Sequence, residues 1–283
     1  MKYFNYHTHT DYCDGKGTLE ENIISAVSSG ITDLGFSSHA PVYFNPAWTM
    51  KEDRFASYKS EISGLKKKYE NRISIFTGLE VDYIPGITGP GSENIISKNL
   101  DYTIGAVHVL GRPDDDSLVP ITGNSMSFEK SVNEKLDGDV VFSVKEYFRL
   151  LREMLINEPP DILAHFDLIK KINVDYVLFD ENSTWYLNEI YDTLDVLKRT
   201  DVITEINTGA LTRKKADSLF PSDLILNELC AGKMPVTVNS DSHSPSDICG
   251  LYPETFIKIS KTGFKSVKRF VSRGCWTDYE IVT

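Results

Sequence analysis

The amino-acid sequence predicts an α/β fold, a distorted (β/α)7 barrel that is TIM-like but has one strand fewer. Seven short stretches rich in β-branched and aromatic residues alternate with helical patterns along the chain. The 283 residues fall in the size range of a single α/β barrel, and no linker, internal repeat or low-complexity segment divides them. We therefore expect residues 1–283 to form one barrel domain.

The alternation of strands with helices favours parallel strands that are covered by helices on the outside. The strands are expected at residues 2–6, 31–36, 72–78, 101–107, 161–164, 201–206 and 234–239. In a parallel barrel, functional side chains gather at the C-terminal ends of the strands. The fold alone therefore predicts where a site would lie.

Two helices in the first third of the chain have readable ends. A capping box from Thr18 to Glu21 predicts the start of the first helix, and Gly30 stands at the C′ position past its end. Apolar residues spaced three and four apart predict the second helix over residues 55–69.

The later helices are predicted from similar signals. A second capping box, from Ser143 to Glu146, predicts the start of a helix that the pair Pro159–Pro160 closes. Apolar periodicity predicts another helix over residues 187–197. The remaining expected boundaries are helix starts near Ser222 and after Gly263, and helix ends before Gly232 and Gly274.

The segment at about 111–142 is too long for an ordinary connection between a strand and a helix. It contains the stretches Arg112–Asp116 and Gly123–Met126. We interpret it as a functional loop or small lid. The alternative is an insertion that the fold merely tolerates.

Composition excludes several classes of protein. The formal net charge of −11 argues against a non-specific nucleic-acid binder, although it allows a small anionic substrate held by local cations. The chain has no apolar run of membrane-spanning length and no N-terminal secretory pattern, and its four cysteines form no C-x-x-C pair. We expect a cytoplasmic protein without a membrane partner, and the composition specifies no oligomeric state.

All six histidines lie at or just after the C-terminal end of a predicted strand. They are His7, His9, His39, His108, His165 and His243. Each one alone is more easily read as a hydrogen-bonded structural histidine, but such residues would be scattered over helices and loops. Because all of them converge on the end where barrels build their sites, we predict a metal site.

Carboxylates follow the same strands. Glu80 comes after the third predicted strand, and Asp241 precedes His243 by two residues, which on an extended chain places both side chains on one side. In a closed barrel, this pair would face His7 and His9 across the seam between the last and first strands. The alternatives are a helix N-cap for Asp241 and a plain Asp-Gly turn for Asp14.

The number of candidate ligands predicts more than one ion. The nine candidates are His7, His9, Asp14, His39, Glu80, His108, His165, Asp241 and His243. A catalytic zinc typically takes three protein ligands, so this set suits two or three divalent ions with Glu80 as the bridging carboxylate. Imidazole and carboxylate donors fit zinc, iron or manganese. Cys13 is a further possible ligand, or a thiol packed behind the site.

This set of motifs resembles the polymerase and histidinol phosphatase (PHP) family of metal-dependent phosphoesterases, and within it the histidinol-phosphatase branch. The motifs run through the whole chain in the family order: the H-x-H of His7 and His9, then SSHAP, GLEVDY, GAVHVLG, LAHFDLIKK and NSDSH. The resemblance implies a distorted (β/α)7 barrel with a trinuclear metal site.

The resemblance also implies how the ligands divide among the ions. One ion would take His7, His9, Glu80 and Asp241; a second Asp14, His39 and His243; a third Glu80, His108 and His165. Two departures from the family pattern stand out. Ser38 replaces a residue that is often acidic, and the segment NTGALTR shifts the arginine, Arg213, that would bind the substrate phosphate.

The reaction implied by the branch is hydrolysis of L-histidinol phosphate to L-histidinol and phosphate, in histidine biosynthesis. A metal-bridging hydroxide would attack phosphorus, and Asp241 or His243 would manage protons. Lys170, Lys171 and Arg213 would hold the phosphate, or else are surface charges. Asp82 would bind the substrate amine; the alternative is a carboxylate that supports a metal-binding histidine.

Three other functions remain open from the sequence. The metal centre would also suit another phosphomonoester or a phosphodiester, although the acidic charge argues against a nuclease. A non-catalytic metal-binding protein would be favoured by a missing ligand, yet every expected position is filled. Metal-assisted amide hydrolysis or deamination on a related barrel would not need the trailing lysines and arginine.

Overall fold

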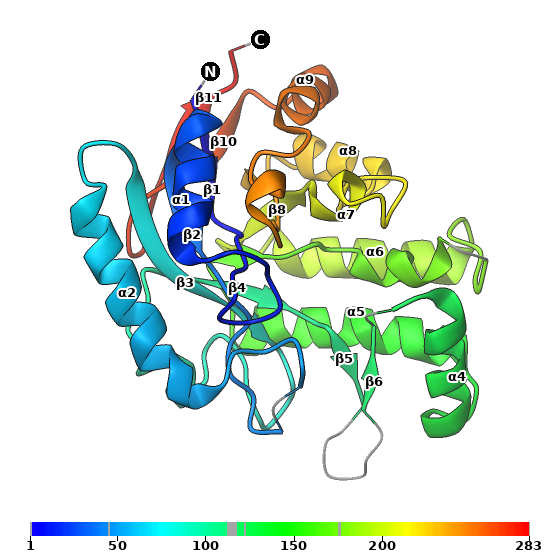
Figure 1. Ribbon diagram of the computed structural model, residues 1–283. Coiled ribbons are helices and arrows are strands. Elements are labelled where there is room, and N and C mark those ends of the chain that lie inside the picture. The colour runs from blue at the N-terminus through cyan, green and yellow to red at the C-terminus, as the bar shows by residue number, and fades with distance from the viewer. Residues whose placement is uncertain (1, 45, 112–117, 122, 175–176, 283) are drawn as a thin grey trace.

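The computed structural model describes residues 2–44, 46–111, 118–121, 123–174 and 177–282. Seven parallel strands form one sheet in the order β1-β2-β3-β4-β7-β8-β9, which confirms the predicted seven-stranded barrel (Figure 1). The strands are β1 (Tyr3–Asn5), β2 (Ile31–Phe36), β3 (Ser74–Asp82), β4 (Tyr102–Ala106), β7 (Ile162–Leu163), β8 (Ile203–Asn207) and β9 (Val236–Asn239). Each overlaps a predicted stretch.

The barrel closes at the C-terminal ends of its strands. Beyond β1 and β9, Thr8 pairs with Ser242 in a parallel bridge, and the His9 N–H donates to the Ser242 carbonyl at 2.8 Å. Earlier along both strands, the side-chain amide of Asn5 spans the seam, donating to Ser240 Oγ at 2.8 Å and accepting from the Ser240 N–H at 3.0 Å. The first and last strands are therefore joined where the site was predicted.

Helices cover the outside of the barrel (Figure 1). They are α1 (Leu19–Ser28), α2 (Phe55–Lys68), α3 (Glu93–Ile96), α4 (Ser125–Lys135), α5 (Val140–Asn157), α6 (Thr184–Leu197), α7 (Gly209–Thr212), α8 (Asp223–Ala231) and α9 (Tyr252–Thr262), with 3-10 turns at Glu52–Arg54, Leu168–Asn173 and Pro245–Asp247. The predicted capping box of α1 is present: Thr18 Oγ1 accepts from the Glu21 N–H at 3.2 Å, and Glu21 Oε2 accepts from the Thr18 N–H at 2.7 Å.

The predicted capping box at Ser143 is wrong by about one turn. Helix α5 begins at Val140, because the Asp139 carboxylate accepts from the Phe142 N–H at 2.8 Å and so caps the helix earlier. Ser143 Oγ instead donates to the Asp139 carbonyl at 2.8 Å. The helix ends at Asn157, before the two prolines, as expected.

The predicted helix after Gly263 is also wrong. Helix α9 precedes Gly263, whose φ of 120° terminates it. A β-hairpin follows, formed by β10 (Ser266–Ser272) and β11 (Cys275–Glu280) with Gly274 in the turn. The segment buries Val267 and Phe270 against the barrel, and this tertiary packing of β-branched and aromatic residues favours strands.

The hairpin seals the barrel at the N-terminal ends of β3 and β4 with an aromatic cluster. Phe270 and Trp276 of the hairpin pack against Tyr6 and Tyr102, and the Phe270 N–H donates to the Tyr6 hydroxyl at 2.9 Å. A side chain at Gly78 would place its Cβ 2.5 Å from the Tyr102 ring, so glycine is needed there. This end of the barrel is a packed core.

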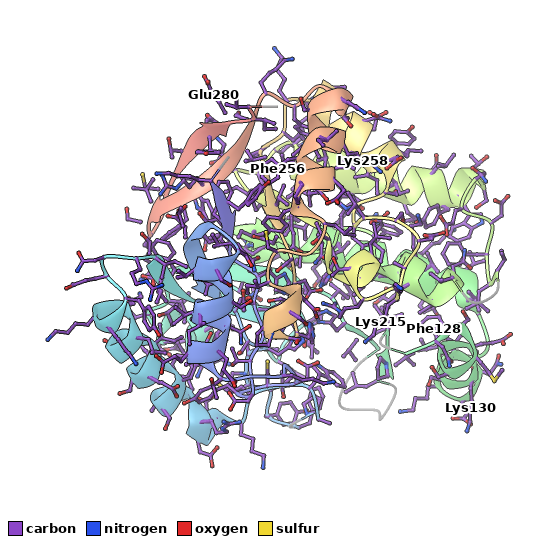
Figure 2. The ribbon with its side chains drawn as sticks, turned by 45° about the horizontal axis from the view of Figure 1, so that its top comes forward. Phe128, Lys130, Lys215, Phe256, Lys258 and Glu280 are labelled. Carbon is purple, nitrogen blue, oxygen red and sulfur yellow. The ribbon has the colours of Figure 1, made fainter. Side chains whose placement is uncertain are left out.

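The segment at 111–142 carries structure of its own. Strands β5 (Val109–Leu110) and β6 (Val119–Pro120) form a hairpin, and α4 follows, with Phe128 buried in the main core. The stretch Arg112–Asp116 lies outside the described residues. Figure 2 shows Phe128 on the inner part of α4 and Lys130 pointing outward.

No helix among the described residues is long and apolar enough to cross a membrane.

Candidate metal centre

The structure places the predicted ligands together at the C-terminal ends of the strands. His7 and His9 follow β1, and His39 follows β2, where it forms a bridge with Glu80 of β3. The others come from the loops after β1, β4, β7 and β9, in the order Asp14, His108, His165, Asp241 and His243. The loop ends of five strands, together with a residue of β3, thus converge on one site.

Glu80 lies at the centre of this arrangement and is almost completely buried. Its Oε2 lies 3.0 Å from His39 Nδ1, 3.3 Å from His7 Nε2 and 3.4 Å from His9 Nε2. Its Oε1 lies 3.0 Å from His165 Nε2 and 3.6 Å from His108 Nε2. One carboxylate therefore faces five imidazoles, which is the position that a bridging ligand needs.

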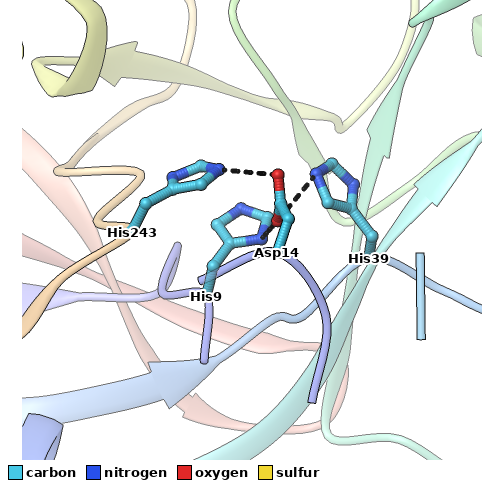
Figure 3. A group of neighbouring side chains, drawn as sticks. All are labelled: His9, Asp14, His39 and His243. Atoms are coloured by element: carbon cyan, nitrogen blue, oxygen red, sulfur yellow. Dashed lines mark ion pairs between the residues drawn. The ribbon is translucent and has the colours of Figure 1, made fainter. Parts of the chain in front are cut away.

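Three groups of side chains among the described residues are close enough to hold a metal ion. They are His9, Asp14, His39 and His243; His7, His9 and Asp241; and His39, Glu80 and His108. Figure 3 shows the first group, in which Asp14 lies between the histidines. Asp14 Oδ2 is 3.5 Å from His243 Nε2, and its Oδ1 is 3.8 Å from His39 Nε2.

The nitrogen and oxygen atoms of this cluster are better suited to binding metal ions than to hydrogen bonding with one another. His7 Nε2, His9 Nε2 and His39 Nδ1 are buried and make no hydrogen bond with any residue that the structure describes, in spite of the nearby carboxylate oxygens. A buried ring nitrogen without a partner is costly unless its lone pair has another use. Imidazole and carboxylate donors without thiolate suit zinc, iron or manganese, and these clusters can bind several divalent ions.

The electrostatics of the cluster keep its carboxylates ionised. Burial would raise the pKa of Glu80, but the surrounding imidazoles, His39 foremost, hold it well below its usual range. Burial lowers the pKa of His9 to about 3, and the charges of His243 and His39 add to this effect. The His9 imidazole is therefore neutral, and its lone pair can bind a metal ion. Burial also opposes a charge on His39, yet Glu80 and Asp14 raise its pKa to about 10.

Two candidate ligands have unusual backbone geometry. His165 has a φ of 20° and Asp241 a φ of 44°, in the range that non-glycine residues rarely adopt. Such conformations persist only where the surrounding structure enforces them, and they concentrate at functional sites.

Two histidines have a carboxylate partner for the nitrogen that faces away from the centre. His108 Nδ1 lies 2.7 Å from Asp82 Oδ1, and His7 Nδ1 lies 2.7 Å from Glu205 Oε1. Because a carboxylate only accepts, these two contacts orient the rings. The geometry of Asp82 thus favours the alternative interpretation, in which it supports a histidine. His9 differs, because its Nδ1 lies 3.4 Å from the Cys13 sulfur and 3.7 Å from Asp14 Oδ1 of the first group.

Sequence reasoning missed Glu205. A signal was available, because a single acidic residue stands inside the otherwise uncharged stretch VITEI of a predicted central strand. A buried charge requires partners.

A cavity of about 340 Å³ opens over the metal-ligand candidates. Its walls include cations, Lys171, Arg213 and Lys215, and an apolar side made of Trp48, Leu168, Ala210 and Phe220. Burial lowers the pKa of Lys171, and the neighbouring positive charge of Lys215 adds to that effect. Lys215 was not predicted; Figure 2 shows it on the loop that follows α7.

The other predicted substrate-binding residues differ in position. The Arg213 guanidinium contacts the backbone carbonyl of Asp241 and lies 3.3 Å from Asp241 Oδ2. Lys170 does not line this cavity, and its Nζ pairs with Glu181 at 3.2 Å. Ser38, at the position where an acidic residue was expected, contacts the Thr10 hydroxyl at 3.2 Å instead of orienting His39.

The fold and the clustered donors define a metal-dependent barrel protein, and comparison with known proteins gives its family. The family model described as PHP domain matches residues 5–209. The chain belongs to the PHP domain family.

Individual relatives agree with this assignment. The chain is 26% identical over 268 residues to the histidinol-phosphatase of Bacillus subtilis, covering 89% of this chain and 97% of that protein. A crystal structure from Listeria monocytogenes has a TM-score of 0.77 at 20% identity, over 88% of this chain and 98% of the other. Histidinol phosphate phosphatase from Lactococcus lactis, solved with zinc, L-histidinol and phosphate, has a TM-score of 0.69 at 19% identity, over 98% and 99% of the two chains.

Proposed function

We propose that this protein is a metal-dependent phosphomonoesterase that hydrolyses L-histidinol phosphate to L-histidinol and phosphate. The observation that carries the proposal is the composition of one cavity, where clustered imidazoles and carboxylates face Lys171, Arg213 and Lys215. A phosphate dianion needs positive charge outside the metal ligands, and this cavity supplies it. The similarity over nearly the full length of the Bacillus subtilis histidinol-phosphatase supports the substrate.

We assign all nine predicted ligands to the metal centre, with the division into three ions described above. Glu80, which faces five imidazoles, is the bridging group. Divalent ions held there would neutralise charge on the phosphate oxygens and generate a nucleophile from water at neutral pH.

The cations of the cavity would orient the substrate. Arg213 contacts Asp241, and it is therefore held beside the ligand cluster with its remaining donors available to a phosphate. Lys171 and Lys215 also line the cavity, and the charges of Lys215 and Arg213 both act on Lys171. Lys170 has no such role, because it pairs with Glu181 and lines another cavity.

Asp241 and His243 are the residues that we propose for handling protons. Asp241 Oδ1 lies 3.2 Å from His9 Nε2, whereas its Oδ2 faces Arg213 at 3.3 Å. The two oxygens thus have different surroundings, one toward the ligands and one toward the substrate cations. His243 Nδ1 donates to the Asp241 carbonyl at 3.0 Å, which directs its Nε2 toward Asp14.

The organic part of the substrate would lie on the apolar wall. Trp48 borders the cavity, and its buried indole N–H has no hydrogen-bond partner within the described part of the chain. Gly123, from the segment 111–142, also lines the cavity, which supports a role for that segment as a lid over one barrel domain. We further propose a cytoplasmic enzyme with no nucleic-acid partner, consistent with a net charge of −11.

The test is phosphate release from L-histidinol phosphate, measured beside an aryl phosphate monoester and a phosphodiester. The protein is stripped of metal and reloaded with zinc, iron or manganese. We expect metal-dependent turnover with a strong preference for histidinol phosphate. Equal, slow rates on all substrates would contradict the proposed substrate. No turnover with any metal would contradict the enzymatic function.

A further inference from the structure

Glu205 is a fully buried carboxylate that lies behind the metal-ligand candidates and does not line the cavity above them. It comes from the middle of β8, which contributes none of the predicted ligands. Its Oε1 lies 2.7 Å from His7 Nδ1 and accepts from Asn239 Nδ2 at 3.0 Å. Its Oε2 accepts from Asn207 Nδ2 at 2.8 Å and from the His165 N–H at 3.2 Å.

Three amide N–H donors and the His7 Nδ1 atom therefore converge on the two oxygens, an arrangement that suits a carboxylate acceptor. His7 must donate from Nδ1, since the carboxylate has no proton to offer. This fixes the tautomer of His7 and leaves the lone pair of Nε2 pointing toward Glu80 and Asp241, 3.3 and 3.6 Å away.

The same carboxylate connects the elements that carry other ligands. It holds the backbone of His165, whose φ of 20° is unusual, at the end of β7. Through Asn239 it also holds the end of β9, two residues before Asp241. One group thus ties together the ends of β1, β7 and β9.

We propose that Glu205 is a positioning residue of the metal centre, which sets the His7 tautomer and thereby the affinity of the group His7, His9 and Asp241 for a divalent ion. This inference rests on the proposed metal centre but not on the identity of the substrate. Carboxylates behind metal-binding histidines are typically worth 10- to 100-fold in metal affinity.

A matched control is available in the same barrel. Asp33 of β2 is also a buried strand carboxylate, but it pairs with Arg269 at 2.9 Å and contacts none of the candidate ligands. The variants Glu205→Gln and Asp33→Asn each replace one buried carboxylate by an amide of the same shape. They separate a specific role in metal binding from a general loss of stability.

The experiment measures zinc affinity of the metal-free full chain by competition with a chromophoric chelator, together with the visible absorption of the cobalt(II) form. We expect Glu205→Gln to bind the tightest zinc about 10- to 100-fold more weakly and to change the cobalt spectrum. We expect Asp33→Asn to keep the affinity and spectrum of the unmodified chain while its melting temperature falls.

The proposal would be overturned if folded Glu205→Gln bound zinc as tightly as the unmodified chain. It would also be overturned if Asp33→Asn lost as much zinc affinity as Glu205→Gln. If circular dichroism shows that Glu205→Gln does not fold, Glu205→Asp is measured by the same criterion, because its shorter side chain keeps the charge but cannot reach all four donors. An unmodified chain that binds no zinc would overturn the metal centre itself. A chain that binds zinc but does not hydrolyse histidinol phosphate would overturn only the substrate, and zinc affinity would still decide the role of Glu205.

Discussion

The two ends of this barrel are lined by opposite kinds of side chain. At the C-terminal end, buried imidazoles and carboxylates surround Glu80, and several ring nitrogens make no hydrogen bond to the residues described in the structure. At the N-terminal end, Tyr6, Tyr102, Phe270 and Trp276 pack in a closed aromatic cluster. The residues that stabilise the fold and the candidate ligands thus gather at opposite ends of the barrel, as in other parallel barrels.

The largest effect is expected for the variant Glu80→Gln at the C-terminal end of the barrel. An amide cannot bridge ions or face five imidazoles as an acceptor on both atoms, so we expect phosphatase activity to fall by more than about a hundredfold, given that even the partners of ligands are worth 10- to 100-fold. Phosphate release and bound zinc per chain are the measurements. A folded variant with full zinc content and activity would contradict the central position of Glu80.

Tyr102→Ala tests the other end. Removing a ring that is enclosed by β2, β3 and the hairpin leaves a cavity, and we expect the free energy of unfolding to drop by about 3–5 kcal/mol. Urea denaturation of the metal-free chain measures this loss. Zinc affinity of the folded fraction should stay unchanged, and a parallel loss of zinc affinity would show that the two ends are coupled.

The variant Arg213→Ala tests whether this arginine binds the substrate phosphate in the cavity. Losing a charged hydrogen-bond donor to phosphate costs about 1.5–3 kcal/mol, so kcat/KM should fall by about 10- to 150-fold. Lys170→Ala is the matched control and should change kcat/KM little, because Lys170 pairs with Glu181 away from this cavity. Equal effects of the two variants would show that overall positive charge matters rather than position.

Asp82→Asn decides between the two interpretations of that carboxylate. If Asp82 orients His108, as their 2.7 Å contact indicates, the variant should weaken zinc binding about tenfold and slow all substrates alike. Zinc affinity and the KM values for histidinol phosphate and an aryl phosphate are measured together. A higher KM for histidinol phosphate alone, with unchanged zinc affinity, would favour the role in amine binding.

Much of the fold follows from local patterns in the sequence. The seven strands are short and bounded by polar residues, and the capping box at Thr18 depends only on residues within one turn. The wrong prediction after Gly263 has a non-local cause. Segment 266–280 forms a hairpin because Phe270 and Trp276 complete an aromatic cluster whose other members lie far away in the chain.

In the candidate site, too, local sequence patterns predict one part and contacts between distant residues determine the rest. The predicted ligands are recognisable because their residue types recur after successive strands, and the structure brings them together. What surrounds them depends on three-dimensional contacts: Lys170 and Lys171 are neighbours in sequence, yet they line different cavities. Glu205 and Lys215 escaped prediction because neither belongs to a repeated pattern.

The closure between Thr8 and Ser242 has a consequence for how the protein is made. Synthesis proceeds from the N-terminus, and the histidines after β1 leave the ribosome more than two hundred residues before Asp241 and His243. A nascent chain therefore carries an incomplete ligand set until His243 has been synthesised. Because the bottom of the barrel also needs segment 266–280, completion of the ligand set and closure of the core depend on neighbouring stretches of the chain.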